Sequence, residues 1–247
     1  MVETRIGTMG WSYDHWVGNF YPEGTDPGDY LSEYAKRFSS VEIDSTFYRI
    51  PYEETVEKWR RQTPNDFKFA AKFPRAITHG RKLGDDPGKL GAFIERVSSL
   101  GSKLGPLLLQ FPPNFDVEKR DALRTFLENL PEGHLYAVEF RHRSWLNEKV
   151  YEMLRENNIA LTLTGHPDML MEHKVTSGFT YIRWQGERGK VRGDTGRVER
   201  DMSGEIGDWA TRIRGFQKES IDVYGYFGKF YSGHPPSDAR KLLESLS

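Results

Sequence analysis

The chain has 247 residues, of which 37% are hydrophobic and 29% are charged, so it can bury a substantial core and is not a disordered polypeptide. Its 35 basic and 36 acidic residues leave a formal net charge of −1, which gives no support for a protein that coats DNA electrostatically, although a local basic patch is compatible with this balance. The chain contains no cysteine, which excludes disulfides, thiolate metal sites and cysteine nucleophiles.

The chain begins MVETRIGTMGW, which lacks the basic and then apolar run of a signal peptide. No stretch of the sequence approaches the length of a membrane span. We therefore expect a cytoplasmic protein without a membrane partner.

Eight short β-rich runs follow one another along the chain: Arg5–Met9, Ser40–Asp44, Phe67–Lys72, Leu107–Gln110, Leu135–Phe140, Ile159–Thr162, Thr180–Trp184 and Ile221–Phe227. Amphipathic, helix-like stretches lie between them: Pro27–Phe38, Glu54–Gln62, Lys89–Leu104, Val117–Leu130, Asn147–Glu156, Gly204–Gln217 and Asp238–Leu246. This alternation predicts a parallel sheet, and eight units in under 250 residues predict one (β/α)8 TIM-type barrel domain over residues 1–247. A dinucleotide fold is disfavoured, because the segment after the first strand, TMGWSYDHW, is bulky rather than glycine-rich.

The alternation of side chains along these strands predicts a charged barrel interior. On the second strand Val41 and Ile43 share one face, so Glu42 and Asp44 are expected to point inward. The same reasoning directs further polar side chains into the barrel: Lys68, Lys72, Gln110, Glu139, Arg141, Thr162, Thr164, Tyr181 and Arg183.

The charges nearest the carboxyl ends of the strands are the better functional candidates, because catalytic residues of such barrels lie there. Asp44, Lys72 and Arg141 belong to this group, whereas Glu42, Lys68 and Glu139 lie deeper and are expected to hold them in place. The alternative is an internal network without chemistry, with Glu42 paired to Lys68 and Glu139 paired to Arg141.

Aromatic residues crowd the predicted rim, and flat rings beside charges suit a sugar, a nucleobase or another flat polar ligand. The rim residues are Trp11, Tyr13, Trp16, Phe47, Tyr48 and Trp145; packing of the loops is the alternative role for each. The polar, glycine-rich segment Gln185–Asp201 follows the seventh strand, and we expect a mobile loop there, either a solvated surface loop or a substrate lid.

The motifs IGTMGW, FYP, VEIDSTFY, GPLLLQFPP, AVEFRHRSW and VYGYFGK occur in this order along the chain, which thereby resembles the YecE-like family, also called domain of unknown function 72. The resemblance implies a (β/α)8 barrel and names no established reaction. It implies these strand-end positions: Gly10, Trp11, Glu42, Ser45, Thr46, Phe47, Tyr48, Lys72, Gln110, Pro112, Glu139, Arg141 and Trp145.

Two departures from the family pattern stand out. Asp44 replaces the asparagine of the usual VEINSTFY, and Gly228 and Lys229 replace the two asparagines of a Phe-Asn-Asn motif in the last strand. We hypothesise that the added acid and the added base, Asp44 and Lys229, compensate each other across the barrel mouth.

The first functional hypothesis is an enzyme acting on a phosphorylated or nucleotide-like substrate, with a small anionic ligand and no organic cofactor. Arg141, Arg183, Lys72 and Lys229 would hold anionic oxygens, and Glu139 or Asp44 would be the general base or acid, with Lys72 as a further catalytic group. The remaining substrate-binding candidates are Gln110, Glu42, Trp11, Tyr13, Tyr48 and Trp145.

Other chemistries remain open. Metal-assisted hydrolysis would use Glu42, Asp44, Glu139 and His79, but a divalent metal is not favoured, because so many cations match these carboxylates. Glycoside hydrolysis would use Glu42 and Glu139, and Schiff-base chemistry would use Lys72.

The second functional hypothesis is a non-catalytic protein that binds nucleic acid or a small anion. It rests on two basic stretches, Arg75–Lys82 and Arg183–Arg200, which could border the mouth and follow a phosphate backbone. The alternative is ordinary surface charge balanced by nearby acids. The oligomeric state is left open.

Overall fold

The structure is a computed structural model that describes residues 2–80, 83–84, 86–165 and 174–247. Its eight strands are all parallel and follow the order β1-β8-β7-β6-β5-β4-β3-β2, which confirms the predicted barrel. The strands are β1 Thr4–Thr8, β2 Ser40–Ile43, β3 Lys68–Lys72, β4 Leu104–Gln110, β5 Tyr136–Glu139, β6 Ala160–Thr164, β7 Phe179–Gly186 and β8 Asp222–Phe230.

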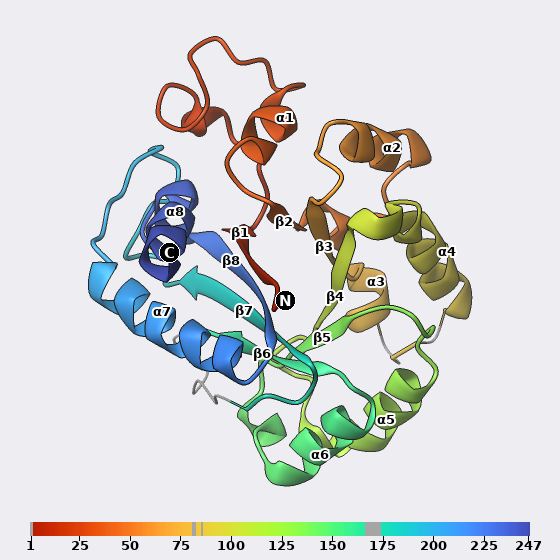
Figure 1. Cartoon of the computed structure of the whole chain (residues 1–247). Coiled ribbons are helices and arrows are strands. Elements are labelled where there is room, and N and C mark those ends of the chain that lie inside the picture. The colour runs from red at the N-terminus through yellow and green to blue at the C-terminus, as the bar shows by residue number, and fades with distance from the viewer. Residues whose placement is uncertain (1, 81–82, 85, 166–173) are drawn as a thin grey trace.

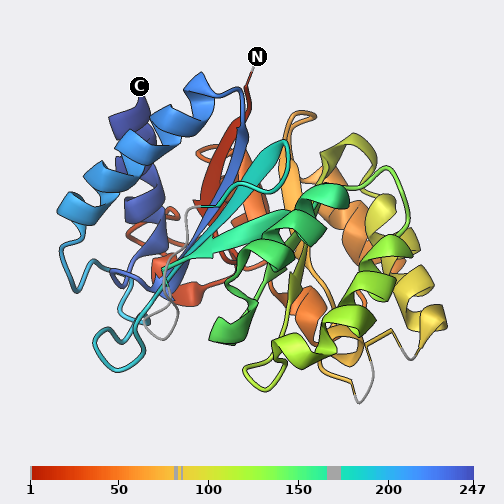
Figure 2. The same ribbon diagram turned by 90° about the horizontal axis from the view of Figure 1, so that it is seen from below.

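Helices surround these strands on the outside (Figure 1). They are α1 Tyr30–Ala35, α2 Glu53–Arg61, α3 Arg75–Thr78, α4 Pro87–Ser98, α5 Arg120–Glu128, α6 Glu148–Glu156, α7 Ser203–Lys218 and α8 Pro235–Leu246. Short 3₁₀ helices occupy Asp14–Trp16, Ser45–Phe47, Gly101–Lys103, Val117–Lys119 and Arg143–Trp145. In the view of Figure 2 both termini lie at the end of the barrel where β1 begins.

Two helices end well short of their predicted boundaries. The helix expected over Pro27–Phe38 covers only Tyr30–Ala35, and the one expected over Lys89–Leu104 ends at Ser98. Gly101 follows with a φ of 59°, a left-handed conformation that stops the helix before β4.

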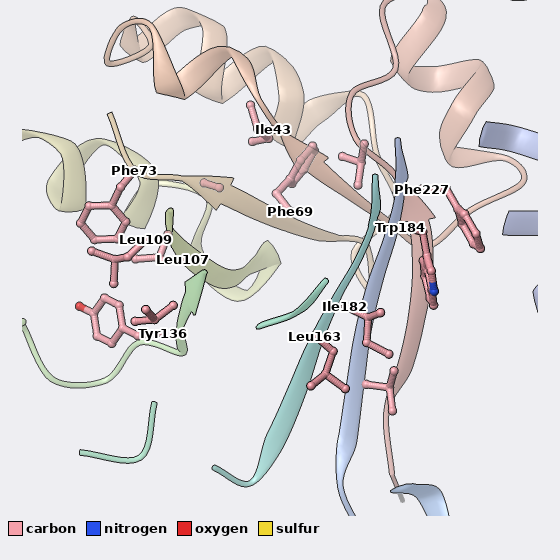
Figure 3. Packing of buried hydrophobic residues seen from close by; sticks show 14 of the residues in the cluster. Ile43, Phe69, Phe73, Leu107, Leu109, Tyr136, Leu163, Ile182, Trp184 and Phe227 are labelled. Carbon is pink, nitrogen blue, oxygen red and sulfur yellow. The ribbon is translucent and has the colours of Figure 1, made fainter. Parts of the chain in front are cut away.

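The main core lies between the strands and the helices. Ile43, Phe69, Val138 and Ile182, all predicted to face outward, are fully buried in this layer, part of which is drawn in Figure 3. Their inward neighbours therefore fill the barrel interior, as the strand alternation predicts.

The barrel closes between β1 and β2 through close backbone contact. A single parallel bridge joins Met9 to Glu42, and a Cβ on Gly7 would lie 2.1 Å from the carbonyl oxygen of Ser40. The hydroxyl of Tyr34 accepts a hydrogen bond from the backbone N–H of Thr8 (2.9 Å) and donates one to the Ser40 carbonyl (3.0 Å). The close approach at Gly7 and the hydrogen bonds of Tyr34, on α1, thus join β1 to β2 in place of a regular ladder of backbone hydrogen bonds.

The barrel interior is layered along its axis. An apolar and aromatic cluster fills its lower part, with Phe179, Tyr181, Tyr224 and Tyr226 as its large members. The charged residues lie above it, toward the carboxyl ends of the strands, which is where barrels of this class carry their sites. In the part of the chain that the structure describes, no helix has both the length and the apolar character needed to cross a bilayer.

Candidate binding site at the barrel mouth

Arg183 on β7 is the centre of a buried charge network. Its Nε and Nη2 donate to the two carboxylate oxygens of Glu42 at 2.9 and 2.8 Å, and its Nη1 donates to Glu139 at 2.7 Å. The hydroxyl of Tyr181 also donates to Glu42, at 2.8 Å. Burial raises the pKa of Glu42, while the bidentate contact with Arg183 opposes that effect.

Glu139 also has two partners on the side of the cavity, Gln185 and Arg141. Gln185 donates to it at 3.0 Å, and Arg141 forms an ion pair with it through Nε. Arg141 in turn donates from Nη2 to the Gln185 side-chain oxygen at 2.6 Å. Burial by itself would raise the pKa of Glu139, but the charges of Arg183 and Arg141 outweigh it and lower that pKa to about 2.

A cavity of about 770 Å³ opens above this network. Its walls come from the strand ends and from the loops after β1, β2, β5 and β7. The lining residues are Met9, Tyr13, Asp44, Phe47, Tyr48, Lys72, Gln110, Arg141, Arg183, Gln185, Gly186, Glu187, Arg188, Gly228, Lys229 and Phe230. Eight of the twelve predicted site residues border this cavity: Asp44, Lys72, Arg141, Arg183, Gln110, Tyr13, Tyr48 and Lys229. Glu139 does not border it, but it is ion-paired with Arg141, which does.

Lys72 differs from the arginines in this wall. Its Nζ lies 4.1 Å from the centre of the Phe47 ring, and among the described residues it has neither an ion pair nor a hydrogen bond. Burial, followed by the charge of Arg183, lowers the pKa of Lys72. The strand end that carries it is fixed, because Thr46 donates to the Lys72 carbonyl oxygen at 2.7 Å.

Asp44 and Lys229 both border the cavity, but they do not form an ion pair. Asp44 Oδ1 lies 3.6 Å from Nη2 of Arg183 and is buried without a hydrogen bond, while Lys229 lies over the ring of Phe230 at 5.0 Å. Compensation of these two departures across the barrel mouth stays a prediction, since the ion-pair partner of Asp44 in the structure is Arg183. Each presents its charge to the cavity separately.

The comparisons with known proteins fit the motifs and the fold. A family model described as "Protein of unknown function DUF72" matches residues 5–247. The chain belongs to the DUF72 family. It is 37% identical over 137 residues to the UPF0759 protein YecE of Escherichia coli, in a match covering 56% of this chain and 48% of that protein, so it spans about half the length of that relative. It is 27% identical over 268 residues to the UPF0759 protein YunF of Bacillus subtilis, covering 98% of this chain and 94% of YunF.

A solved structure of a DUF72 family protein from Thermotoga maritima matches with a TM-score of 0.81 at 26% identity, covering 99% of each chain. A methyltransferase from Methanosarcina mazei matches with a TM-score of 0.54 at 9% identity, which shows a shared fold alone.

Three of the six predicted rim aromatics do not line the cavity of this DUF72 protein. Trp16 is buried and packs against Tyr13 with ring centres 4.6 Å apart. The other two are Trp145 and Trp11. Trp145 is fully buried, stacks on Phe140 with ring centres 4.5 Å apart and donates from Nε1 to the Phe115 carbonyl oxygen at 2.6 Å. Trp11 packs edge-on against Trp59 at 5.6 Å and lines a separate surface hollow. Both therefore pack the loops, which was the alternative role considered for them.

Glu42 does not border the cavity either, because it is wholly enclosed by Arg183 and Tyr181. In the alternative of an internal network, Glu42 would pair with Lys68; the structure does not form that pair, since Lys68 Nζ donates to the Ser102 carbonyl oxygen at 2.8 Å, at the end of β3 away from the cavity. The pairing expected between Glu139 and Arg141 is confirmed.

His79 is not brought together with the three acids proposed as metal ligands. It packs against Phe47 at 5.2 Å and lines a different hollow, and burial together with Lys72 and Arg75 lowers its pKa to about 4. Within the described ranges, no group of three or more histidine, aspartate and glutamate side chains could hold a metal ion.

Six cavity residues are not among the candidates that the sequence singles out: Met9, Gln185, Gly186, Glu187, Arg188 and Phe230. Gln185 was within reach of the strand alternation, since it follows Tyr181 and Arg183 on the same face, but the predicted strand ended at Trp184 while β7 continues to Gly186. The strand β8 likewise continues past its predicted end to Phe230.

The loop after β7 is fastened to the barrel at several points. Glu199 accepts hydrogen bonds from the backbone N–H groups of Arg192 (2.8 Å) and Gly193 (2.9 Å), and its own N–H donates to the Ser232 carbonyl oxygen at 2.7 Å. Two of its basic residues are paired locally, Lys190 with Glu187 at 2.6 Å and Arg192 with Asp194 at 3.2 Å. In the other basic stretch, Arg81 and Lys82 lie outside the described residues.

Proposed function

We propose that this protein is an enzyme that acts on a phosphorylated or nucleotide-like substrate in the cavity at the barrel mouth. The observation that carries the proposal is the set of cations in the cavity wall. Arg141, Arg183 and Lys229 line the cavity, and Lys229 has no carboxylate partner among the described residues, so its charge is available to an anion.

Arg141 is the best placed group to orient such an anion. Its Nε and Nη2 are engaged by Glu139 and Gln185, which leaves Nη1 without a partner among the described residues. An arginine held on one edge by buried partners presents its remaining donors in a fixed direction, which lowers the entropic cost of binding. Lys229 on the opposite wall supplies a second, exposed positive charge.

Aromatic faces at the same opening suit the rest of such a substrate. Tyr48 is 84% exposed and borders the cavity together with Phe47, Tyr13 and Phe230. A sugar or a nucleobase can pack on rings of this kind while the phosphoryl group lies deeper.

In this proposal Asp44 and Lys72 transfer protons to and from the substrate, because both border the cavity. Glu139 acts as a positioning residue, since it is fully buried and holds Arg141 and Arg183. Its low pKa and its burial argue against the role of general base considered above. Glycoside hydrolysis by Glu42 and Glu139 is disfavoured for the same reason, because both carboxylates are occupied by Arg183 below the cavity.

The proposal is tested by titrating the protein with inorganic phosphate and nucleoside monophosphates by calorimetry at low salt, and by assaying turnover of a panel of phosphate esters. Lys229→Gln should weaken binding about 5- to 10-fold, as expected for loss of one partly screened charge. Lys218→Gln is the matched control, because Lys218 is an exposed lysine just before the other end of the same strand. Binding with no turnover on the panel would favour the non-catalytic anion-binding protein, and equal affinities for both variants would remove the proposed site.

A further inference from the structure

Two lysines of this protein are buried to nearly the same extent but have opposite surroundings. Lys103 is 6% exposed and donates three hydrogen bonds, to the carbonyl oxygens of Arg60 (2.6 Å) and Thr63 (2.7 Å) and to the Thr63 hydroxyl (3.2 Å). Lys72 is 8% exposed and has no such acceptor among the described residues. Only Lys72 borders the cavity at the mouth.

A buried ammonium group without acceptors is unfavourable, so the protein favours the neutral amine at this position more than water does. The adjacent guanidinium of Arg183 acts in the same direction, while the carboxylates of Asp44, Glu139 and Glu42 oppose it. A neutral amine carries a free electron pair and is a nucleophile, which an ammonium ion is not.

We propose that Lys72 forms an imine with a small anionic aldehyde or ketone bound at the barrel mouth. The inference rests on the proposed function, because Arg141 and Lys229 would hold the anionic group of the same substrate. Phe47 lies under the Nζ of Lys72, Asp44 and Gln110 line the same cavity, and the charge of Asp44 acts on Lys72.

The reaction balances without an oxidant or a cofactor. The Nζ electron pair forms a bond to the carbonyl carbon, and the carbonyl π pair moves to oxygen, which takes up a proton to give a carbinolamine. The nitrogen loses one proton, the hydroxyl group is protonated and leaves as water, and the nitrogen electron pair forms the C=N bond of a protonated imine. Loss of the second nitrogen proton gives the neutral imine, so the products are the imine and one water molecule.

Asp44 is the group on the cavity wall that can move these protons. Its Oδ1 is buried, has no hydrogen bond and lies 3.6 Å from Arg183 Nη2, so it can accept the proton from nitrogen and return it to the departing hydroxyl group. The positive charges of Arg141 and Lys229 would keep the phosphate or carboxylate of the substrate away from Asp44, which separates the anionic end from the reacting carbonyl group.

The test traps the imine by reduction. The intact protein is incubated with glycolaldehyde phosphate or dihydroxyacetone phosphate and sodium cyanoborohydride near neutral pH, digested and mapped by mass spectrometry. We expect one dominant adduct at Lys72, at least about 10-fold above that at any exposed lysine, since an exposed amine is mostly protonated at this pH. Unphosphorylated glycolaldehyde should label Lys72 at least about 10-fold more slowly, if the anion is held as proposed.

Lys68→Met is the matched control, because Lys68 lies on the same strand at the far end of the barrel and its loss should leave the label unchanged. Lys72→Met should remove the label, and the peptide map of the unmutated protein locates it even if that variant fails to fold. Label confined to exposed lysines would overturn the inference. Phosphate binding without a Lys72 adduct would do the same while leaving the proposed function intact, and an adduct without any phosphate binding would remove the proposed function instead.

Discussion

The two sides of the barrel mouth differ in how their charges are satisfied. On the β5 and β7 side, Glu139, Arg183 and Arg141 are linked to one another and to Glu42, and every one of these groups has a partner. On the β3 and β8 side, Lys72 and Lys229 rest on aromatic rings and have no carboxylate partner among the described residues. The first side is a network of buried charges that are all paired with one another. The second side leaves the charge of Lys229 available to a ligand.

This contrast bears on what the buried network contributes. A buried ion pair is not a strong source of stability, because desolvation offsets much of the attraction between its charges. Its better supported effect here is geometric, since Arg183 fixes both carboxylates and Glu139 fixes Arg141 at the cavity wall. Removing one member of the network leaves its partners buried and unpaired. We therefore expect such a substitution to lower the free energy of unfolding far more than the loss of Lys72 or Lys229.

The largest effect is expected for Arg183→Met. The substitution leaves the carboxylates of Glu42 and Glu139 buried without their shared cation, which should lower the free energy of unfolding by about 3–5 kcal/mol in urea denaturation. Arg155→Met is the matched control, because Arg155 forms an exposed ion pair with Glu148 at 2.8 Å and should change stability by less than about 1 kcal/mol. Equal losses in the free energy of unfolding for the two variants would show that the buried network matters no more for stability than an exposed ion pair.

A somewhat smaller effect is expected for Glu139→Gln, and it should depend on pH. The pKa of Glu139 falls from 4.5 to about 2 in the folded state, so its stabilising effect is fully present above pH 4.5 and is lost as the pH falls through 2. This shift corresponds to about 3 kcal/mol near neutral pH.

The measurement for Glu139 is urea unfolding of both proteins at several values between about pH 7 and about pH 3. The stability difference between the unmutated protein and Glu139→Gln should shrink as the pH is lowered. Glu148→Gln, at an exposed carboxylate on α6 whose pKa is lowered by its hydrogen bond with Arg155, should show the same trend over this range but a much smaller change, because solvent screens the pair. A difference that stays constant with pH would mean that Glu139 is not ionised in the folded protein.

The faces of the strands could be predicted from the sequence because side chains alternate strictly along a strand. Glu42 and Arg183 point inward, and Val41 and Ile182 pack outward, as the alternation requires. Alternation fixes the face of a side chain but not its height along the barrel axis. Lys68 and Lys72 share a face, yet one lies at the amino end of β3 and the other at the cavity.

The loops were less predictable for a different reason. Trp11 and Trp145 lie in the loops that follow β1 and β5, and nothing in their spacing distinguishes a ring that lines the mouth from one that folds back on the helices. Tyr48 and Trp145 are both strand-end aromatics, but the first is exposed and the second is fully buried. The deciding contacts, such as that of Trp145 with Phe140 and Phe115, are set by tertiary packing.

The smallest effect on stability is expected for Lys72→Met. Unlike the substitutions in the buried network, it should leave the free energy of unfolding unchanged or slightly higher. Methionine keeps the length of the lysine stem beside Phe47 and removes a buried amine that has no acceptor, so stability should stay within about 1 kcal/mol of the unmutated protein or rise slightly. Lys103→Met should instead lose about 2–3 kcal/mol, because the carbonyl oxygens of Arg60 and Thr63 lose their donor. Thermal and urea unfolding of the two variants measure this difference directly. A loss at Lys72 as large as that at Lys103 would make Lys72 a structural residue, whereas unchanged stability together with lost ligand chemistry would mark it as a residue retained for function.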